Sequence, residues 1–180
     1  MCGIVGYAGN LQAASILLDG LARLEYRGYD SAGIAVADRA EDGTETLEVV
    51  KAKGRLKVLC EMTDNGRAVA GTCGIGHTRW ATHGEPSVAN SHPHCAGDKR
   101  VAVVHNGIIE NFQEIKDKLL KSGVEFISQT DTEVLAHLLD KYYNGNPIEA
   151  ITKMMVRLRG SYDLGILFKD RPGEIYAVRK

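Results

Sequence analysis

The chain begins with the stretch Met1–Asn10, MCGIVGYAGN, which holds a short apolar run next to a cysteine at position 2. Within it, Ile4–Ala8 has the length and apolar character of a buried β-strand. The stretch has no basic segment, and Gly6 and Gly9 interrupt its apolar residues, so we expect no signal peptide. The elements that follow this strand decide the fold class.

Working outward, Leu11–Leu24 carries apolar residues at helical spacing and predicts a helix. Ala32–Ala37 and Leu47–Lys51 predict two strands of an antiparallel pair, joined around the polar turn at 41–43. Val101–Val104 predicts a buried strand.

The remaining segments add three helices and two strands to this list. The helices are expected over Asn111–Lys121, Thr132–Tyr143 and from Pro147 to near Val156, and the strands over Tyr162–Phe168 and Ile175–Val178. We expect Asn111 and Glu114 to cap the first of these helices and Gly123 to end it. Strands and helices are grouped rather than strictly alternating, which favours an α+β fold with largely antiparallel sheet covered by helices.

The composition is that of a globular protein of 180 residues, 44% hydrophobic and 25% charged, which favours a single domain over residues 1–180. A formal net charge of -1 argues against nucleic acid or an anionic membrane as a partner. No apolar run approaches the length of a membrane span. Four cysteines without C-x-x-C spacing predict reduced thiols and a cytoplasmic location. The chain stops at Lys180 directly after a predicted strand, so we expect the domain to continue beyond it.

Cys2 is the first candidate for chemistry. Removal of Met1 would place its thiol and a free α-amine on one residue, and that amine can act as the general base for the thiol. A histidine such as His77 or His105 is the substitute base if the amine does not serve. On position alone, a small buried residue at the start of a strand is the commoner case.

Asn106-Gly107 lies between apolar residues, where Asn-Gly is a strong signal for a hairpin turn. The same two residues could form an oxyanion hole from the Asn106 side-chain amide and the Gly107 N–H. The two interpretations are compatible.

The polar run from Gly76 to Ser87 contains Arg79 and the only tryptophan, Trp80. The guanidinium of Arg79 suits a carboxylate, although a surface arginine stacked on Trp80 is the plain alternative. A zinc site is a second alternative, but the spacing of its candidate ligands matches no standard structural zinc pattern. Those candidates are His77, His83, His92, His94 and Cys95.

Thr130 and Glu133 satisfy the pattern of a capping box for the helix that follows. Asp131 in the first turn would complement the helix dipole. Alternatively, Asp131 could bind an α-ammonium group, and Arg79 and Asp131 would then hold both ends of an amino acid whose side-chain amide reaches Cys2.

Together these segments resemble the class II glutamine amidotransferases of the N-terminal-nucleophile hydrolase superfamily, and most of all the glutaminase domains of glutamine–fructose-6-phosphate aminotransferases. The matching segments are Met1–Gly6, Leu24–Gly33, His77–Ser87, His105–Asn111 and Thr130–Glu133. The resemblance covers essentially the whole chain.

The resemblance implies an αββα sandwich and hydrolysis of L-glutamine without a metal or cofactor. It implies that Cys2 is the nucleophile, that Asn106 and Gly107 hold the oxyanion, and that Arg27 supports the site. Arg79 and Asp131 would bind the α-carboxylate and α-amino groups of glutamine.

Thr82 and His83 would make further contacts to the substrate, and Trp80 would gate an ammonia passage. The passage would lead to sugar-phosphate isomerase domains that this sequence does not contain, in a full-length enzyme expected to be a homodimer. Two other functions stay open: a glutaminase that serves a different acceptor, and a metal-stabilised binding module.

Overall fold

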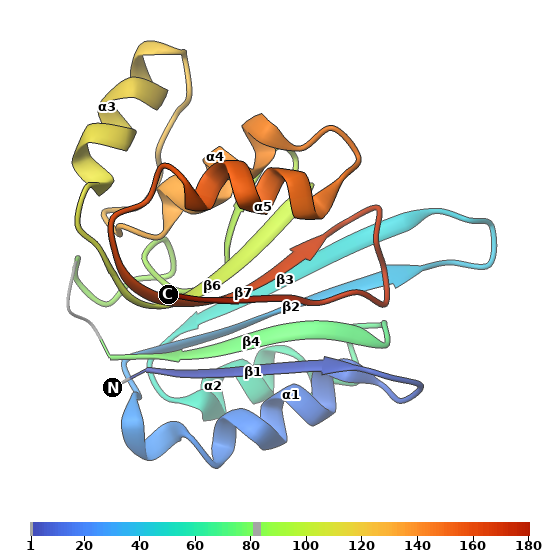
Figure 1. Cartoon of the computed structure of the whole chain (residues 1–180). Helices are drawn as coiled ribbons and strands as arrows, with labels where there is room; N and C mark the ends of the chain where they lie inside the picture. Colours follow the sequence, from blue (N-terminus) through green and yellow to red (C-terminus); the bar gives the residue numbers. More distant parts are fainter. Residues whose placement is uncertain (1, 81–83) are drawn as a thin grey trace.

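The computed structural model describes residues 2–80 and 84–180 and shows two four-stranded antiparallel sheets packed face to face. Helices cover the outer face of each sheet, so the layers run helix, sheet, sheet, helix (Figure 1). The predicted αββα sandwich is confirmed. No helix in the described part of the chain is long and apolar enough to cross a membrane.

The first sheet has the strand order β1-β4-β2-β3. Its strands are β1 (Gly3–Ala8), β2 (Ser31–Arg39), β3 (Glu45–Lys53) and β4 (Cys73–Arg79). The helices α1 (Ala13–Ala22) and α2 (Leu56–Met62) cover its outer face, and a 3-10 turn, η1 (Glu25–Arg27), leads from α1 towards β2. Because Gly3 pairs with Thr78, the start of β1 lies beside the end of β4. This pairing brings Cys2 next to Arg79 and Trp80.

The second sheet has the order β5-β6-β7-β8. Its strands are β5 (His94–Ala96), β6 (Val101–Ile109), β7 (Gly160–Phe168) and β8 (Tyr176–Arg179). The helices α3 (Phe112–Lys121), α4 (Glu133–Tyr142) and α5 (Pro147–Met155) share one apolar core with it. Pro147 stands at the first position of α5, where its missing N–H costs nothing.

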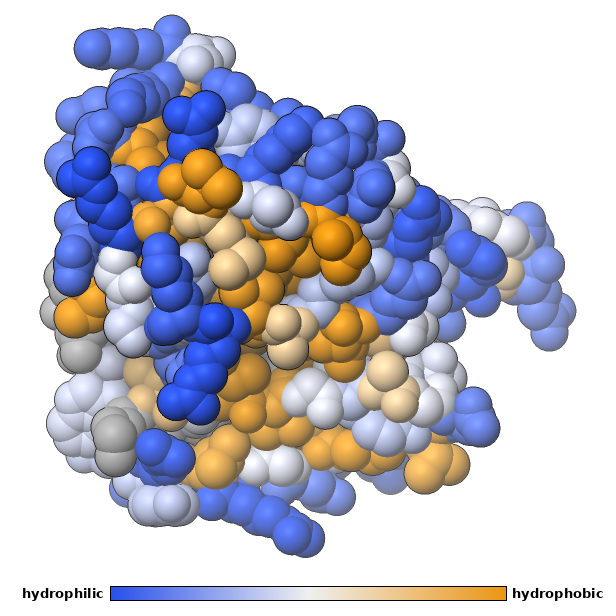
Figure 2. All heavy atoms as spheres, viewed as in Figure 1, coloured by the Kyte–Doolittle hydropathy of each residue, from blue (hydrophilic) through white to orange (hydrophobic). Residues whose placement is uncertain are grey.

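Small and medium apolar side chains fill the space between the two sheets. The buried members are Ala35, Ala37, Leu47, Cys73, Ile75, Ala102, Val104 and Leu167. Figure 2 shows apolar side chains reaching the surface where the edge strands β1 and β8 lie. The sheets are thus held together by burial of apolar area, and the polar side chains of the candidate site gather at one end of the strands.

The predicted strands and helices are confirmed with shifted ends, but three elements were missed. The sequence analysis predicted none of α2, β4 and β5. β4 carries Gly74 and Gly76 among buried polar residues, so it lacks the alternation of apolar and polar residues that identifies a strand. A side chain at Gly74 would collide with Leu17 of α1, which explains why glycine stands there.

The hairpin turn predicted at Asn106-Gly107 is wrong, because both residues lie inside β6 and pair with Asp163 and Tyr162. Gly107 has a φ of +125°, and a Cβ there would collide with the carbonyl oxygen of Ser161. The glycine therefore permits close contact between two strands rather than a turn.

The predicted end of α3 at Gly123 is confirmed, with a φ of +84° at that glycine, but both predicted N-terminal caps are wrong. The hydroxyl of Thr130 contacts His94 and Ser128, and the carboxylate of Glu133 accepts hydrogen bonds from the N–H groups of Ile127 and Ser128. Asn111 does not cap α3, because its side chain bonds the backbone of Arg157 and Arg159. In each case a tertiary or loop contact takes the group that a local cap would use.

Candidate active site

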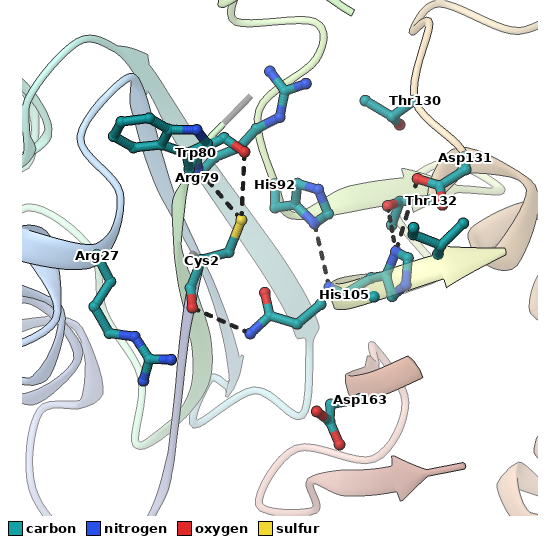
Figure 3. Close-up of a pocket in the computed structure, with 13 residues that line it drawn as sticks. Cys2, Arg27, Arg79, Trp80, His92, His105, Thr130, Asp131, Thr132 and Asp163 are labelled. Atoms are coloured by element: carbon teal, nitrogen blue, oxygen red, sulfur yellow. Dashed lines mark hydrogen bonds and ion pairs between the residues drawn. The ribbon is translucent and has the colours of Figure 1, made fainter. Parts of the chain in front are cut away.

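A cleft of about 400 Å³ opens where the ends of β1 and β4 meet β6 and the segment before α4 (Figure 3). Seven of the nine residues to which the resemblance gives a role line it: Cys2, Arg27, Arg79, Trp80, Asn106, Gly107 and Asp131. Thr82 and His83 lie outside the described residues. The two sheets therefore bring together side chains that are up to 129 positions apart in the chain.

The half-buried thiol of Cys2 lies against the backbone of Trp80. The Trp80 N–H donates to Sγ at 3.3 Å, and Sγ lies 3.6 Å from the Trp80 carbonyl oxygen. From the other sheet, Nδ2 of Asn106 donates to the Cys2 carbonyl oxygen at 3.4 Å. Cys2 is thus held at the junction of the two sheets, with its sulfur in the cleft (Figure 3).

The edge of β6 turns backbone N–H groups toward this cleft. The His105 N–H donates to Nδ1 of His92 at 3.2 Å, and the Ile109 N–H donates to Oδ2 of Asp131 at 2.9 Å. Alternate residues of a strand point their N–H groups to the same side, so that of Gly107 lies between these two. Tyr162, opposite Gly107, exchanges its backbone hydrogen bonds with Lys180 instead. The Gly107 N–H and the Asn106 side-chain amide are therefore neighbouring donors beside Cys2.

Arg79 and Asp131 supply opposite charges to the cleft. Arg79 is only 3% exposed, and its guanidinium donates to the carbonyl oxygens of Gly84 and Glu85. The alternative of a surface arginine is therefore wrong. Asp131 is 7% exposed, with one carboxylate oxygen on the Ile109 N–H and the other 3.9 Å from Nδ1 of His105. Figure 3 shows both groups in the upper part of the pocket, with the Cys2 sulfur lower in the view.

Arg27 and Trp80 frame the cleft on the side of Cys2. Arg27 belongs to η1, and Figure 3 shows it on the other side of Cys2 from Asp131. The Trp80 ring is 45% exposed and packs edge-on against Tyr29, with ring centroids 5.3 Å apart. A Cβ on Gly28 would collide with the backbone of Arg79, so glycine lets this segment lie against the end of β4.

Four buried histidines, His77, His92, His94 and His105, lie close to these groups, and two of them, His92 and His105, line the cleft. Burial lowers the pKa of His77 to about 4 and that of His94 to about 3, and it places the pKa of His92 well below the ordinary value. Burial also lowers the pKa of His105, against the opposing effect of the Asp131 carboxylate. These rings are therefore neutral near pH 7, and they serve as hydrogen-bonding groups rather than as charged ones.

The histidines do not form a metal centre within the described residues. Among residues 2–80 and 84–180, no group of three or more His, Cys, Asp or Glu is arranged to hold a metal ion. Two ring nitrogens instead face hydroxyls: Nδ1 of His105 lies 2.9 Å from Thr132, and Nε2 of His94 lies 3.1 Å from Thr130. The zinc alternative thus finds no geometric support in this part of the chain.

Sequence reasoning missed what the histidines do and the presence of Thr132 and Asp163 in the cleft. The sequence analysis offered His77 as a zinc ligand or substitute base, and His105 only as a substitute base. Their positions in the sequence could have indicated a role near the site. His77 precedes Arg79 by two residues, and His105 directly precedes Asn106.

Comparison with known proteins agrees with this geometry. Residues 77–180 match the family model described as a glutamine amidotransferase domain. Over all 180 residues the chain is 57% identical to the glutamine–fructose-6-phosphate aminotransferase (isomerizing) of Caldanaerobacter subterraneus subsp. tengcongensis, and it spans 29% of that protein. The protein of the same name from Thermus thermophilus is 51% identical over 179 residues, and the chain spans 28% of it.

Solved structures show the same fold. The glutamine phosphoribosylpyrophosphate amidotransferase from B. subtilis, complexed with ADP and GMP, is 28% identical with a TM-score of 0.74, covering 93% of this chain and 35% of that one. A glutamine aminotransferase class-II domain protein from Silicibacter pomeroyi is 16% identical with a TM-score of 0.63, covering 99% of this chain and 76% of that one, and supports the fold alone. The chain belongs to the family of class II glutamine amidotransferase domains.

Proposed function

We propose that this domain hydrolyses L-glutamine to glutamate and ammonia through a thioester on Cys2. The observation that carries the proposal is one cleft lined by Cys2, Asn106, Gly107, Arg79 and Asp131, in which the Asn106 amide donates to the Cys2 carbonyl oxygen. A nucleophile, an oxyanion hole and a pair of charges for an amino acid are the parts that amide hydrolysis at a glutamine side chain needs.

The reaction begins when Cys2, freed of Met1, transfers its thiol proton to its own α-amine. The sulfur attacks the amide carbon, and the oxygen takes up negative charge that Asn106 Nδ2 and the Gly107 N–H stabilise. The C–N bond then breaks, and ammonia leaves with the proton from the α-ammonium group. A water molecule, deprotonated by the same amine, hydrolyses the thioester to glutamate and regenerates the thiol. Burial lowers the pKa of His77 to about 4 and also lowers the pKa of His105, which makes both rings weaker bases than the α-amine.

The ends of the substrate are bound by charge. The Arg79 guanidinium takes the α-carboxylate of glutamine, and the Asp131 carboxylate takes the α-ammonium group. Thr82 and His83 add contacts to the substrate, and Arg27 supports the site beside the nucleophile.

We assign the ammonia to the amination of fructose 6-phosphate, giving glucosamine 6-phosphate, in a longer polypeptide. The support is that relatives at 50–57% identity are named for this reaction, while the chain spans only about 29% of their length. Residues 1–180 would act as the glutaminase domain, Trp80 would gate the passage of ammonia, and isomerase domains would bind the sugar phosphate. The whole enzyme would be a cytoplasmic homodimer.

Removal of Met1 provides the test. A chain that keeps Met1 has a peptide nitrogen at Cys2, which cannot accept a proton. We expect glutamate release from glutamine, and labelling by an electrophilic glutamine analogue, only from the form that begins at Cys2. Mass spectrometry confirms each form, and Cys2→Ala is the control without a nucleophile. Equal reaction of the two forms would show that the α-amine is not the base, and glutamate release by Cys2→Ala would exclude Cys2 as the nucleophile.

A further inference from the structure

The side chain of His77 in β4 reaches across to β6 in the other sheet. Its Nε2 lies 3.0 Å from Oδ1 of Asn106 and 3.2 Å from the carbonyl oxygen of His105. The other end of the Asn106 amide, Nδ2, donates to the carbonyl oxygen of Cys2. His77 therefore contacts the side chain that donates to Cys2, while His77 itself is not among the residues that line the cleft.

These contacts decide the tautomer of His77. Both atoms that face Nε2 are oxygens that only accept, so Nε2 must carry the hydrogen of the neutral ring. With the hydrogen on Nδ1, a lone pair on Nε2 would face two oxygens at 3.0–3.2 Å. Nδ1 of His77 is buried and has no hydrogen-bond partner among the described residues, which agrees with this assignment.

Packing holds the His77 ring in place. The side chain is fully buried and stacks on His92, with ring centroids 4.1 Å apart and 16° between the planes. His92 is itself fixed, because its Nδ1 accepts the His105 N–H of the same strand that carries Asn106. A ring clamped in this way cannot turn its Nε2 away from the amide.

We infer that His77 is a positioning residue that orients the Asn106 amide for the oxyanion. This inference rests on the proposed function. The two ends of an amide have nearly the same shape, so Asn106 could enter the site with either its NH₂ or its oxygen toward Cys2. The His77 N–H selects the orientation in which Oδ1 points to His77 and Nδ2 points to the site. The opposite orientation would place a carbonyl oxygen against the developing negative charge.

The test compares two substitutions in the intact protein freed of Met1. In His77→Gln the amide nitrogen is as many bonds from Cα as Nε2 of histidine, so the donor is retained. In His77→Asn the amide is one bond shorter and cannot reach Asn106. Loss of an oxyanion donor costs about 10²–10³-fold in turnover, so we expect His77→Asn to lower kcat for glutamine hydrolysis by about 10–100-fold. We expect KM to change by less than about threefold, and His77→Gln to recover most of the loss.

A double-mutant cycle separates positioning from a merely structural effect. If His77 acts through Asn106, then adding His77→Asn to Asn106→Ala should lower kcat by less than about threefold. His94→Asn is the matched control, because it removes a buried histidine of the same cluster that bonds Thr130 and not Asn106. In the double variant His94→Asn/Asn106→Ala, the fold decreases in kcat of the two single variants should multiply. Alkylation of Cys2 by iodoacetamide forms no oxyanion, so its rate should be the same in His77→Asn and wild type if the nucleophile is intact.

The outcomes distinguish the two proposals. If wild type releases no glutamate from glutamine, the proposed function fails and the role of His77 fails with it. If wild type is active but the Gln and Asn variants lose equal activity, or the effects of His77→Asn and Asn106→Ala multiply, only the role of His77 is overturned. A higher KM with an unchanged kcat in His77→Asn would likewise overturn the role of His77.

Discussion

Asp131 shows at the residue scale how one side chain can hold a neighbouring strand and also line the cleft. One carboxylate oxygen is fixed by the Ile109 N–H of β6, while the residue lines the cleft opposite Arg27. The contact to β6 holds the carboxylate in place without neutralising its charge. Under the proposed function, this nearly solvent-free carboxylate is the group that binds the α-ammonium of glutamine.

We predict that Asp131→Asn raises KM for glutamine by about tenfold to a hundredfold and changes kcat far less, because a charged hydrogen bond contributes about 1.5–3 kcal/mol to binding. Steady-state kinetics of glutamate release measure both constants. Asp117→Asn, on the exposed face of α3, is the matched control for the loss of one charge. An unchanged KM would remove Asp131 from the substrate site.

Asn106 is predicted to behave in the opposite way. Asn106→Ala removes a donor that acts on the transition state, so kcat should fall by about 10²–10³-fold while binding of glutamate is largely spared. Isothermal titration with glutamate and turnover of glutamine give the two quantities. Equal losses of binding and turnover would mean that the residue serves the strand and not the reaction.

At the scale of secondary structure, one edge of β6 carries the two proposed oxyanion donors, Asn106 and Gly107. The strand pairs with β5 only through Val101–Val103, so its edge beyond Val104 is left to the cleft. Gly107 sits in the middle of this edge, where its φ of +125° and the nearby carbonyl oxygen of Ser161 exclude a side chain. The short β5 thus leaves this edge unpaired by a strand, and the glycine allows β6 and β7 to approach closely there.

We predict that Gly107→Ala lowers the free energy of unfolding by at least about 2 kcal/mol, since it adds a steric collision to backbone strain. Gly123→Ala is the control: its φ of +84° is also unfavourable to alanine, but a Cβ there meets open space. That variant should lose only about 1 kcal/mol. Urea denaturation of both variants measures the difference. Equal losses of unfolding free energy in the two variants would show that the collision with Ser161 adds nothing to the cost of alanine at position 107.

At the scale of the whole molecule, the site exists only where the two sheets meet. Cys2, His77 and Arg79 come from the first sheet and the segment before it, while His105, Asn106 and Gly107 come from the second. The four histidines fill the junction as neutral rings, so the stability of the sandwich depends on keeping them unprotonated.

We predict that this junction makes the protein acid-sensitive between pH 6.5 and about 4. His77 and His94 have pKa values near 6.5 when unfolded and about 4 and about 3 when folded, so the unfolded state binds protons first as pH falls. Stability is complete above pH 6.5 and declines below it, by about 1.4 kcal/mol per pH unit for each histidine that stays neutral in the fold. Glu133, with a pKa lowered to about 2, adds a loss in the same direction below pH 4.5.

Urea denaturation at pH 7.5 and pH 5.5 measures this decline. His94→Gln should flatten it, because glutamine does not titrate. A free energy of unfolding that is the same at both pH values would show that the histidines are not buried as neutral rings.

The sequence by itself determined the fold class, most of the helices and strands and most members of the site. Periodic apolar residues identify elements because each element buries one face, and the segments around Cys2, Arg79, Asn106 and Asp131 carry residue types suited to amide chemistry. Predictions from local patterns failed where a residue contacts a partner far away in the chain. The failures are the caps at Thr130 and Asn111, the turn at Asn106-Gly107 and the strand β4.

Only the tertiary structure decided that Asn106 lies within a strand edge beside Cys2. It also assigned the buried histidines to hydrogen bonding rather than to a metal centre in the described residues. The physical reason is that donor direction, tautomer and pKa depend on burial and on partners far away in the chain, and these exist only after the two sheets have packed.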